Sequence, residues 1–97
     1  MRLNEKVAIV VGAGQQPGET IGNGRATAIR FAEEGANVLL VDKNERLALE
    51  TLDLIENKGG AAKVQIADIT DEDDCKTIST ACMHYFGKID ILHNNVG

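Results

Sequence analysis

The residues best suited to chemistry lie in a glycine-rich segment between Gly12 and Gly24. It contains five glycines and stands between an apolar run and a segment with helical periodicity. Because glycine has no Cβ, main-chain N–H groups and a helix N-terminus can approach a phosphate closely at such a place. In the best register, Gly22, Asn23 and Gly24 lead into the helix and cradle the phosphate, while Gly12 makes the turn out of the strand. The segment therefore predicts a phosphate-binding loop.

An aspartate follows this loop at the distance expected of a ribose-binding acid. Asp42 ends the second apolar run, eighteen residues after Gly24, close to the ~20 at which such an acid stands in dinucleotide-binding units. A carboxylate there accepts hydrogen bonds from both hydroxyls of the adenosine ribose and repels a 2′-phosphate, which favours NAD over NADP. Lys43 and Arg46 stand nearby and leave NADP as the alternative. The other interpretation makes Asp42 a polar residue that merely ends a strand.

Short apolar runs alternate with helical patterns along the chain. The runs are typical of strands buried on both faces of a parallel sheet; they cover residues 7–11, 38–41, 64–67 and 89–92. Three helices are expected between them: one after Gly24, one from a capping Asn44 to a stop at Gly59 and Gly60, and one capped by Thr70. The order β-α-β-α-β-α-β predicts right-handed crossovers and half of a doubly wound α/β fold, as one domain over residues 1–97.

The third helical pattern carries both cysteines. Cys75 and Cys82 share an apolar stripe, so both are expected to be small core residues. Seven helical residues separate them by about 10 Å, beyond the ~7 Å between Cα atoms that a disulfide can bridge. His84 points off that stripe and His93 lies on another segment, so no metal site is proposed. The acids at positions 71–74 suit the positive end of the helix dipole, and a cation site is the alternative.

Composition excludes several classes of protein. The chain is 43% apolar and 26% charged, as in soluble globular proteins. Ten basic against fifteen acidic residues give a net charge of −5, and there are three aromatic residues, so nucleic-acid binding is not expected. No apolar run approaches the ~18 residues of a membrane-spanning helix. The five apolar residues before Gly12 fall short of the ~7–15 of a secretory signal, so a cytosolic location is expected.

The loop, Asp42 and two further motifs together resemble the short-chain dehydrogenase/reductase family, over essentially the whole chain. The segment that begins with Asp68 and Ile69 is similar to the family's Asp-Val-Thr segment, whose acid contacts the adenine amino group. The Asn-Asn-Val-Gly sequence from Asn94 to Gly97 is similar to the family's Asn-Asn-Ala-Gly motif, which supports the sheet and lines the cofactor cleft. The resemblance implies a Rossmann-type sheet with strand order 3-2-1-4, an NAD cofactor and hydride transfer to or from an alcohol or carbonyl substrate.

The chain departs from the family pattern at the first loop. Nine residues, 13–21, stand where the family usually has three. Val11 occupies the place of a Thr, and Asn23 that of an aliphatic residue. The extra residues form either a flap over the cofactor or a tolerated surface excursion.

The catalytic Ser, Tyr and Lys of the family lie downstream of its Asn-Asn-Ala-Gly motif, the Lys four residues after the Tyr. Here Tyr85 precedes that motif, and Lys88 follows Tyr85 by three residues instead of four. Ser79 lies within the third predicted helix, so none of the three receives a catalytic role. We therefore expect the chain to supply the dinucleotide-binding half of an enzyme that forms oligomers, with the substrate-binding half encoded further on or on another chain. The alternative is a stand-alone nucleotide-binding or assembly module without redox chemistry.

Overall fold

The computed structural model describes residues 3–13, 23–68 and 71–94. Three of the predicted site residues, Gly22, Ile69 and Gly97, lie outside the described residues, as do most of the extra positions in the first loop.

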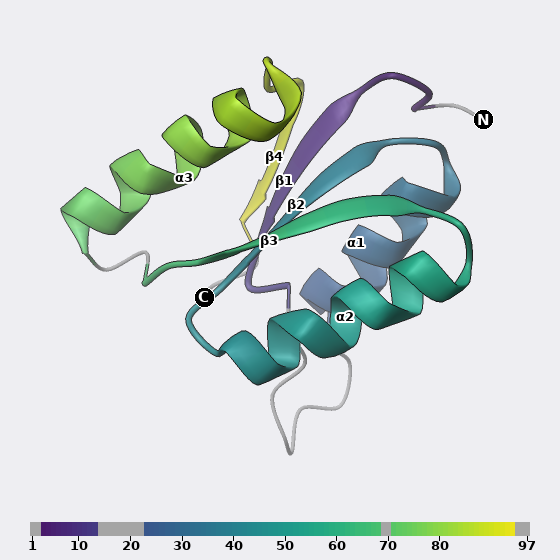
Figure 1. The fold of residues 1–97 in the computed structure, drawn as a ribbon, viewed down its shortest axis with the longest axis horizontal. Helices are drawn as coiled ribbons and strands as arrows, with labels where there is room; N and C mark the ends of the chain where they lie inside the picture. The colour runs from purple at the N-terminus through teal and green to yellow at the C-terminus, as the bar shows by residue number, and fades with distance from the viewer. Residues whose placement is uncertain (1–2, 14–22, 69–70, 95–97) are drawn as a thin grey trace.

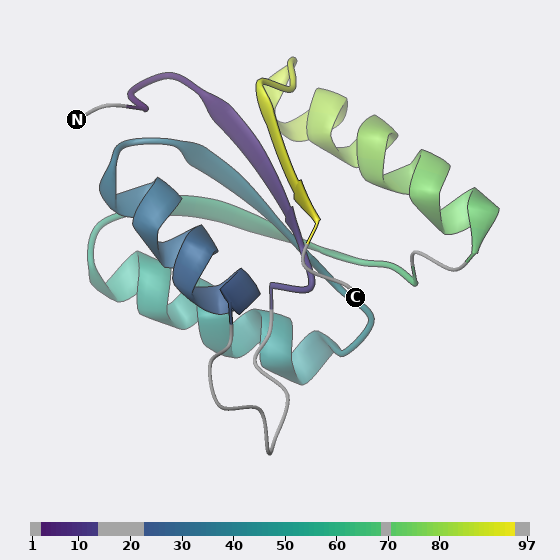
Figure 2. The ribbon, with the colours of Figure 1, turned by 180° about the vertical axis from the view of Figure 1, so that it is seen from behind.

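Seven elements alternate along the chain: β1 (Val7–Val11), α1 (Asn23–Glu33), β2 (Asn37–Asp42), α2 (Glu45–Asn57), β3 (Ala61–Ile66), α3 (Glu72–Phe86) and β4 (Ile91–Asn94). The strands form one parallel sheet in the order β3-β2-β1-β4. Helix α3 covers one face of this sheet, and α1 and α2 cover the other (Figures 1 and 2). The predicted Rossmann-type half-fold and its strand order are confirmed.

Alternate residues of the central strands feed two apolar cores, one on each face. Val7, Ile9 and Val11 pack on the face covered by α3, in a cluster with Ile78 and Cys82. The intervening strand positions pack against α1 and α2, in a second cluster that contains Val10, Val38, Leu40, Ala28, Ala32 and Ile55. Because both faces of β1 and β2 are buried, these strands read as unbroken apolar runs in the sequence.

The ends of α2 follow the predicted signals. Asn44 caps the helix, and its side-chain oxygen accepts a hydrogen bond from the Leu47 N–H at 3.1 Å. At the other end, Gly59 has φ +82°, a conformation that glycine adopts without strain. The main-chain N–H of Gly60 donates to the Ile55 carbonyl at 3.0 Å. The predicted cap and stop are confirmed.

The two edge strands differ from their predicted bounds. β3 begins at Ala61, three residues before the predicted run, because its pairing with β2, and not an apolar composition, defines it. Its edge position leaves it partly exposed. β4 begins at Ile91, two residues later than predicted. The carboxylate of the preceding Asp90 accepts a hydrogen bond from the Val7 N–H at 2.8 Å. The residues that pair with β1 begin after it, at Ile91.

Helix α3 corrects two predictions. Its cap is Asp71, one residue after the predicted Thr70, and the Asp71 side chain accepts from the N–H groups of Asp73 and Asp74 at 2.9 and 3.1 Å. Cys82 is buried as predicted, and burial raises the pKa of its thiol. Cys75 is exposed, so its predicted core position is wrong. It lies in the first turns of α3, before the part of the helix that packs on the sheet.

Candidate functional site

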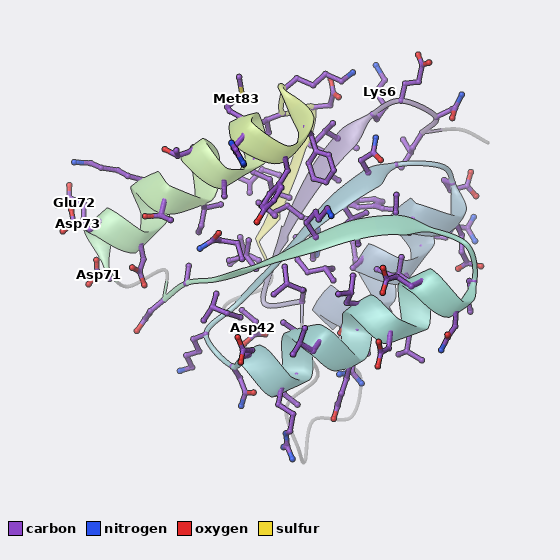
Figure 3. All side chains as sticks on the ribbon, in the orientation of Figure 1. Lys6, Asp42, Asp71, Glu72, Asp73 and Met83 are labelled. Carbon is purple, nitrogen blue, oxygen red and sulfur yellow. The ribbon has the colours of Figure 1, made fainter. Side chains whose placement is uncertain are left out.

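The described candidate residues gather at the carboxyl edge of the sheet. Gly12 follows β1, Asp42 ends β2, Asp68 comes two residues after β3, and Asn94 ends β4. Asn94 pairs in register with the last residue of β1. In open parallel sheets, ligands bind at this edge where the strand order reverses, which here is between β1 and β4. Figure 3 shows Asp42 at the junction of β2 and α2.

Gly12 turns the chain out of β1. Its φ of +77° lies in the left-handed region, which side chains other than hydrogen disfavour. The N–H groups of Gly12 and Ala13 both donate to the carbonyl of Val41, at 2.8 and 3.1 Å. The predicted turn at Gly12 is confirmed, and the start of the loop is fixed to the residue before Asp42.

Gly24 lies within the first turn of α1, which begins at Asn23 and therefore earlier than predicted. A Cβ added to Gly24 would overlap the carbonyl oxygen of Gly12 and stand 2.7 Å from its carbonyl carbon. Only glycine lets α1 approach the end of β1 this closely. Gly24 therefore serves close packing of helix and strand, and its contact with a phosphate stays a prediction.

The start of α1 is the helix end best suited to an anion. A helix N-terminus presents unpaired N–H groups and a partial positive charge. The first turn of α1 contains Arg25 and no acidic residue. By contrast, α2 places Glu45 in its first turn, and α3 places Glu72, Asp73 and Asp74 there. Among the three described helices, α1 is therefore the one whose first turn contains no carboxylate to neutralise the positive helix end.

Asp42 is held in a fixed position at the end of β2. Its side chain is 6% exposed, and its Oδ1 accepts a hydrogen bond from the Asn44 N–H at 2.9 Å. Asn44 in turn caps α2, so the carboxylate also organises the strand-to-helix turn. A carboxylate has about four lone-pair sites for hydrogen bonds, so this structural role is compatible with ribose binding.

Asp68 links the end of β3 to the start of α3. Its N–H donates to Asp74 Oδ2 at 2.8 Å, and its carbonyl accepts from the Asp71 N–H at 3.0 Å. Asp68 is exposed beyond the strand, on the same edge of the sheet as Asp42. The structure thus brings the predicted adenine-binding and ribose-binding acids to neighbouring strand ends.

Sequence reasoning missed two polar residues behind the loop. Thr51 of α2 is completely buried, and its hydroxyl lies 2.9 Å from the carbonyl oxygen of Ala13. Arg25 of α1 donates from Nε to Thr51 Oγ1 at 2.9 Å and pairs with Glu50 at 3.1 Å. The one sequence signal was the place of Thr51, three residues after Ala48 on the apolar stripe of α2.

Tyr85 and Lys88, which share only their residue types with the family's catalytic Tyr and Lys, lie away from this edge. Helix α3 leaves the carboxyl end of β3 and returns to the amino end of β4. Tyr85 stands at its far end, half-exposed, with its ring centroid 5.9 Å from Lys63 Nζ. Lys88 pairs with Asp90 at 3.2 Å, just before β4. These two side chains belong to the opposite end of the sheet from Gly12 and Asp42.

Within residues 3–13, 23–68 and 71–94, no group of three or more His, Cys, Asp or Glu side chains is placed to hold a metal ion. None of the helices in that part of the chain combines the length and the apolar character that crossing a membrane demands.

Comparison with known proteins assigns the family. The family model described as short chain dehydrogenase matches residues 6–97, and the chain belongs to this family. The 7alpha-hydroxysteroid dehydrogenase of Escherichia coli (strain K12) is 38% identical over 97 residues, which cover 100% of this chain and 36% of that protein. The chain spans about a third of the length of the curated relatives that it matches.

Solved structures share the fold and differ in the cofactor named with them. NAD+-bound xylitol dehydrogenase has a TM-score of 0.90 and 35% identity, over 100% of this chain and 35% of that one. A metagenomic short-chain oxidoreductase in complex with NADP has a TM-score of 0.88 and 27% identity, over 100% of this chain and 41% of that one. Both kinds of nicotinamide dinucleotide therefore occur among proteins that this chain resembles.

Proposed function

We propose that the chain is the NAD-binding half of a short-chain dehydrogenase, an oxidoreductase that transfers a hydride between nicotinamide and an alcohol or carbonyl substrate. The observation that carries the proposal is the packing of Gly24 against the Gly12 carbonyl, which sets an acid-free helix N-terminus beside the end of β1. Asp42 stands at the end of the neighbouring strand. The packing of Gly24 on Gly12, the start of α1 and the Asp42 carboxylate together fit a dinucleotide.

We assign the predicted site residues separate parts in holding that ligand. Gly12 turns the main chain out of β1, and Gly24 lets the start of α1 approach that turn, so that this helix end attracts the pyrophosphate. Asp42 accepts hydrogen bonds from the adenosine ribose, and Asp68 with Ile69 receives the adenine ring. Asn94, with Gly97, lines the cleft between β1 and β4. When bound, the nicotinamide ring supplies or accepts the hydride.

NAD is the cofactor that we infer, with NADP as the alternative. The Asp42 carboxylate is buried and fixed by the Asn44 N–H, so it cannot easily turn away from a 2′-phosphate that repels it. Lys43 and Arg46 are exposed beside it and act in the opposite direction. The repulsion of a 2′-phosphate by a fixed carboxylate should outweigh its attraction to two exposed, solvent-screened cations, which supports NAD over NADP.

The proposal is tested by calorimetric titration of the full-length protein with NAD(H) and with NADP(H). We expect NAD(H) to bind more tightly. Equal affinities, or tighter binding of NADP(H), would overturn the inferred part of Asp42. Failure to bind either dinucleotide would overturn the proposed function itself.

The catalytic groups, the substrate and the location of the protein stay predictions. We expect the Ser, Tyr and Lys of the family's chemistry outside residues 1–97, and a cytosolic location. The alternative function, a nucleotide-binding module without redox chemistry, predicts dinucleotide binding with no turnover of any alcohol or carbonyl. Steady-state assays of the full-length protein over a panel of such compounds separate the two functions.

A further inference from the structure

The buried hydroxyl of Thr51 joins three segments that meet behind the predicted pyrophosphate site. Thr51 lies in α2, Ala13 follows the turn at Gly12, and Arg25 lies in the first turn of α1. Thr51 Oγ1 lies 2.9 Å from the Ala13 carbonyl oxygen and 2.9 Å from Arg25 Nε. Thr51 and Ala13 are both 0% exposed, so Thr51 does not itself reach a bound ligand.

The arrangement directs the single hydroxyl proton of Thr51 toward Ala13. Arg25 Nε donates to Oγ1, so the hydroxyl must donate its own proton to a carbonyl. Two carbonyls are in reach, that of Ala13 at 2.9 Å and that of Leu47 at 3.3 Å. The Leu47 carbonyl also accepts from Arg25 Nη2 at 3.2 Å. The shorter distance and the competing donor both favour Ala13.

The main-chain N–H and the carbonyl of Ala13 are thereby both held by hydrogen bonds. Its N–H donates to the Val41 carbonyl at 3.1 Å, and its carbonyl accepts from Thr51. A buried carbonyl that loses its partner is costly, so this orientation is strongly preferred. Gly12, whose turn begins the loop, is bonded to the same Val41 carbonyl at 2.8 Å. The chain thus leaves β1 in one defined direction.

We propose that Thr51 is a positioning residue for the dinucleotide site. Through Ala13 it holds the main chain beside Gly12 and Gly24 in the orientation that receives the pyrophosphate, and this role rests on the proposed function. Without the hydroxyl, part of the binding free energy must order that main chain. Only ligands that carry the pyrophosphate should therefore lose affinity. The ribose end of the site, at Asp42, keeps its own hydrogen bond from Asn44.

The test compares NADH with adenosine as probes of the full-length protein. Thr51→Val removes the hydroxyl at nearly constant shape, and Thr51→Ser retains it. Thr77→Val is the matched control, because the Thr77 hydroxyl bonds the Asp73 carbonyl one helical turn back, at 3.0 Å on the exposed side of α3. We expect Thr51→Val to weaken NADH binding about 5- to 30-fold, as the loss of one buried hydrogen bond predicts. Adenosine binding should not change.

Rescue separates positioning from general damage to the fold. Thr51→Ser should restore NADH affinity to near the wild-type value, and Thr77→Val should leave it unchanged. The inference is overturned if Thr51→Val binds NADH like the wild type, if Ser and Val weaken it equally, or if adenosine affinity falls in parallel. A wild-type protein that binds no NADH overturns the proposed function, and with it this inference.

A second variant decides the matter should Thr51→Val fail to fold. Arg25→Lys keeps a positive charge near Glu50, with which Arg25 pairs at 3.1 Å, but a lysine lacks the planar fork that reaches both Thr51 and Leu47. The Thr51 proton is then less strongly directed to Ala13. If Arg25→Lys binds NADH less tightly than the wild type and binds adenosine equally well, the inference is supported. Wild-type affinity for NADH contradicts it.

Discussion

Gly24 of α1 packs directly on the main-chain carbonyl of Gly12, at the end of β1. The two glycines meet different physical requirements. Gly12 has φ +77° and is needed for its backbone conformation. Gly24 is helical, and its Cβ would overlap the Gly12 carbonyl oxygen, so it is needed for the space that a side chain would fill. Together they bring the N-terminus of α1 to the end of the strand.

Gly24→Ala should therefore displace α1 from β1. The methyl group meets main-chain atoms that cannot rotate aside, so we expect a loss of roughly 1–3 kcal/mol in the free energy of unfolding and a tenfold or greater loss of NAD(H) affinity. Urea unfolding and calorimetry measure the two effects. Gly87→Ala is the control, because Gly87 has φ +78° and nothing within 4 Å of an added Cβ. It should lose stability alone, and wild-type NAD(H) binding by Gly24→Ala would contradict the prediction.

The sequence predicted the fold where local pattern and burial agree. β1 and β2 are buried on both faces, so their apolar runs nearly matched the strands. β3 and β4 lie at the sheet edges, where pairing with one neighbour replaces apolar composition as the signal, and their predicted bounds shifted. Cys75 was misplaced because helical periodicity indicates which residues share a face but not how far the helix overlaps the sheet.

Site prediction from the sequence has a similar limit. Gly12 and Asp42 could be found because each stands at a strand end, at a spacing that one βαβ unit fixes. Contact between Thr51 and Ala13 joins residues 38 positions apart, and it depends on how α2 lies against the loop. A threonine on an otherwise apolar helical stripe could not reveal which carbonyl it binds.

Asp42→Asn should narrow the preference for NAD(H) over NADP(H). The amide oxygen can still accept the Asn44 N–H, now bonded at 2.9 Å, while the charge that repels a 2′-phosphate is gone. We expect the difference in binding free energy between the two dinucleotides to shrink by about 1–3 kcal/mol. Competition titrations with both dinucleotides measure it. Asp53→Asn, on the exposed side of α2, is the matched loss of one charge, and an equal effect there would remove the special role of Asp42.

Asp90→Asn should make the stability of the fold depend less on pH in the acidic range. The Val7 N–H holds the pKa of Asp90 below its ordinary value of 3.8, and Lys88 acts in the same direction, against partial desolvation. A depressed folded-state pKa stabilises the fold above the unfolded pKa, and this contribution is lost as pH falls through the folded value. Wild type should therefore exceed Asp90→Asn in urea midpoint at pH 7, and the difference should shrink below about pH 4. An equal difference at pH 7 and pH 3, or none at pH 7, would contradict this.

The outer edge of β4 should make the 97-residue chain associate with itself. Within the described residues, β4 pairs on one side, with β1. Leu92 is 65% exposed, and it lies in register with Ile9, on the face that α3 covers. An apolar strand edge of this kind favours addition of another strand or aggregation.

Sedimentation of the 97-residue chain at micromolar concentration tests this prediction. Dimers or larger species are expected, and Leu92→Lys should shift them toward monomer, because a charged side chain on an edge strand opposes pairing. Leu49→Lys is the control, since Leu49 is 44% exposed on α2, away from that edge. A monodisperse 10.4 kDa wild-type species with a cooperative unfolding transition would show the edge to be stable on its own, and it would favour the stand-alone module over the enzyme half.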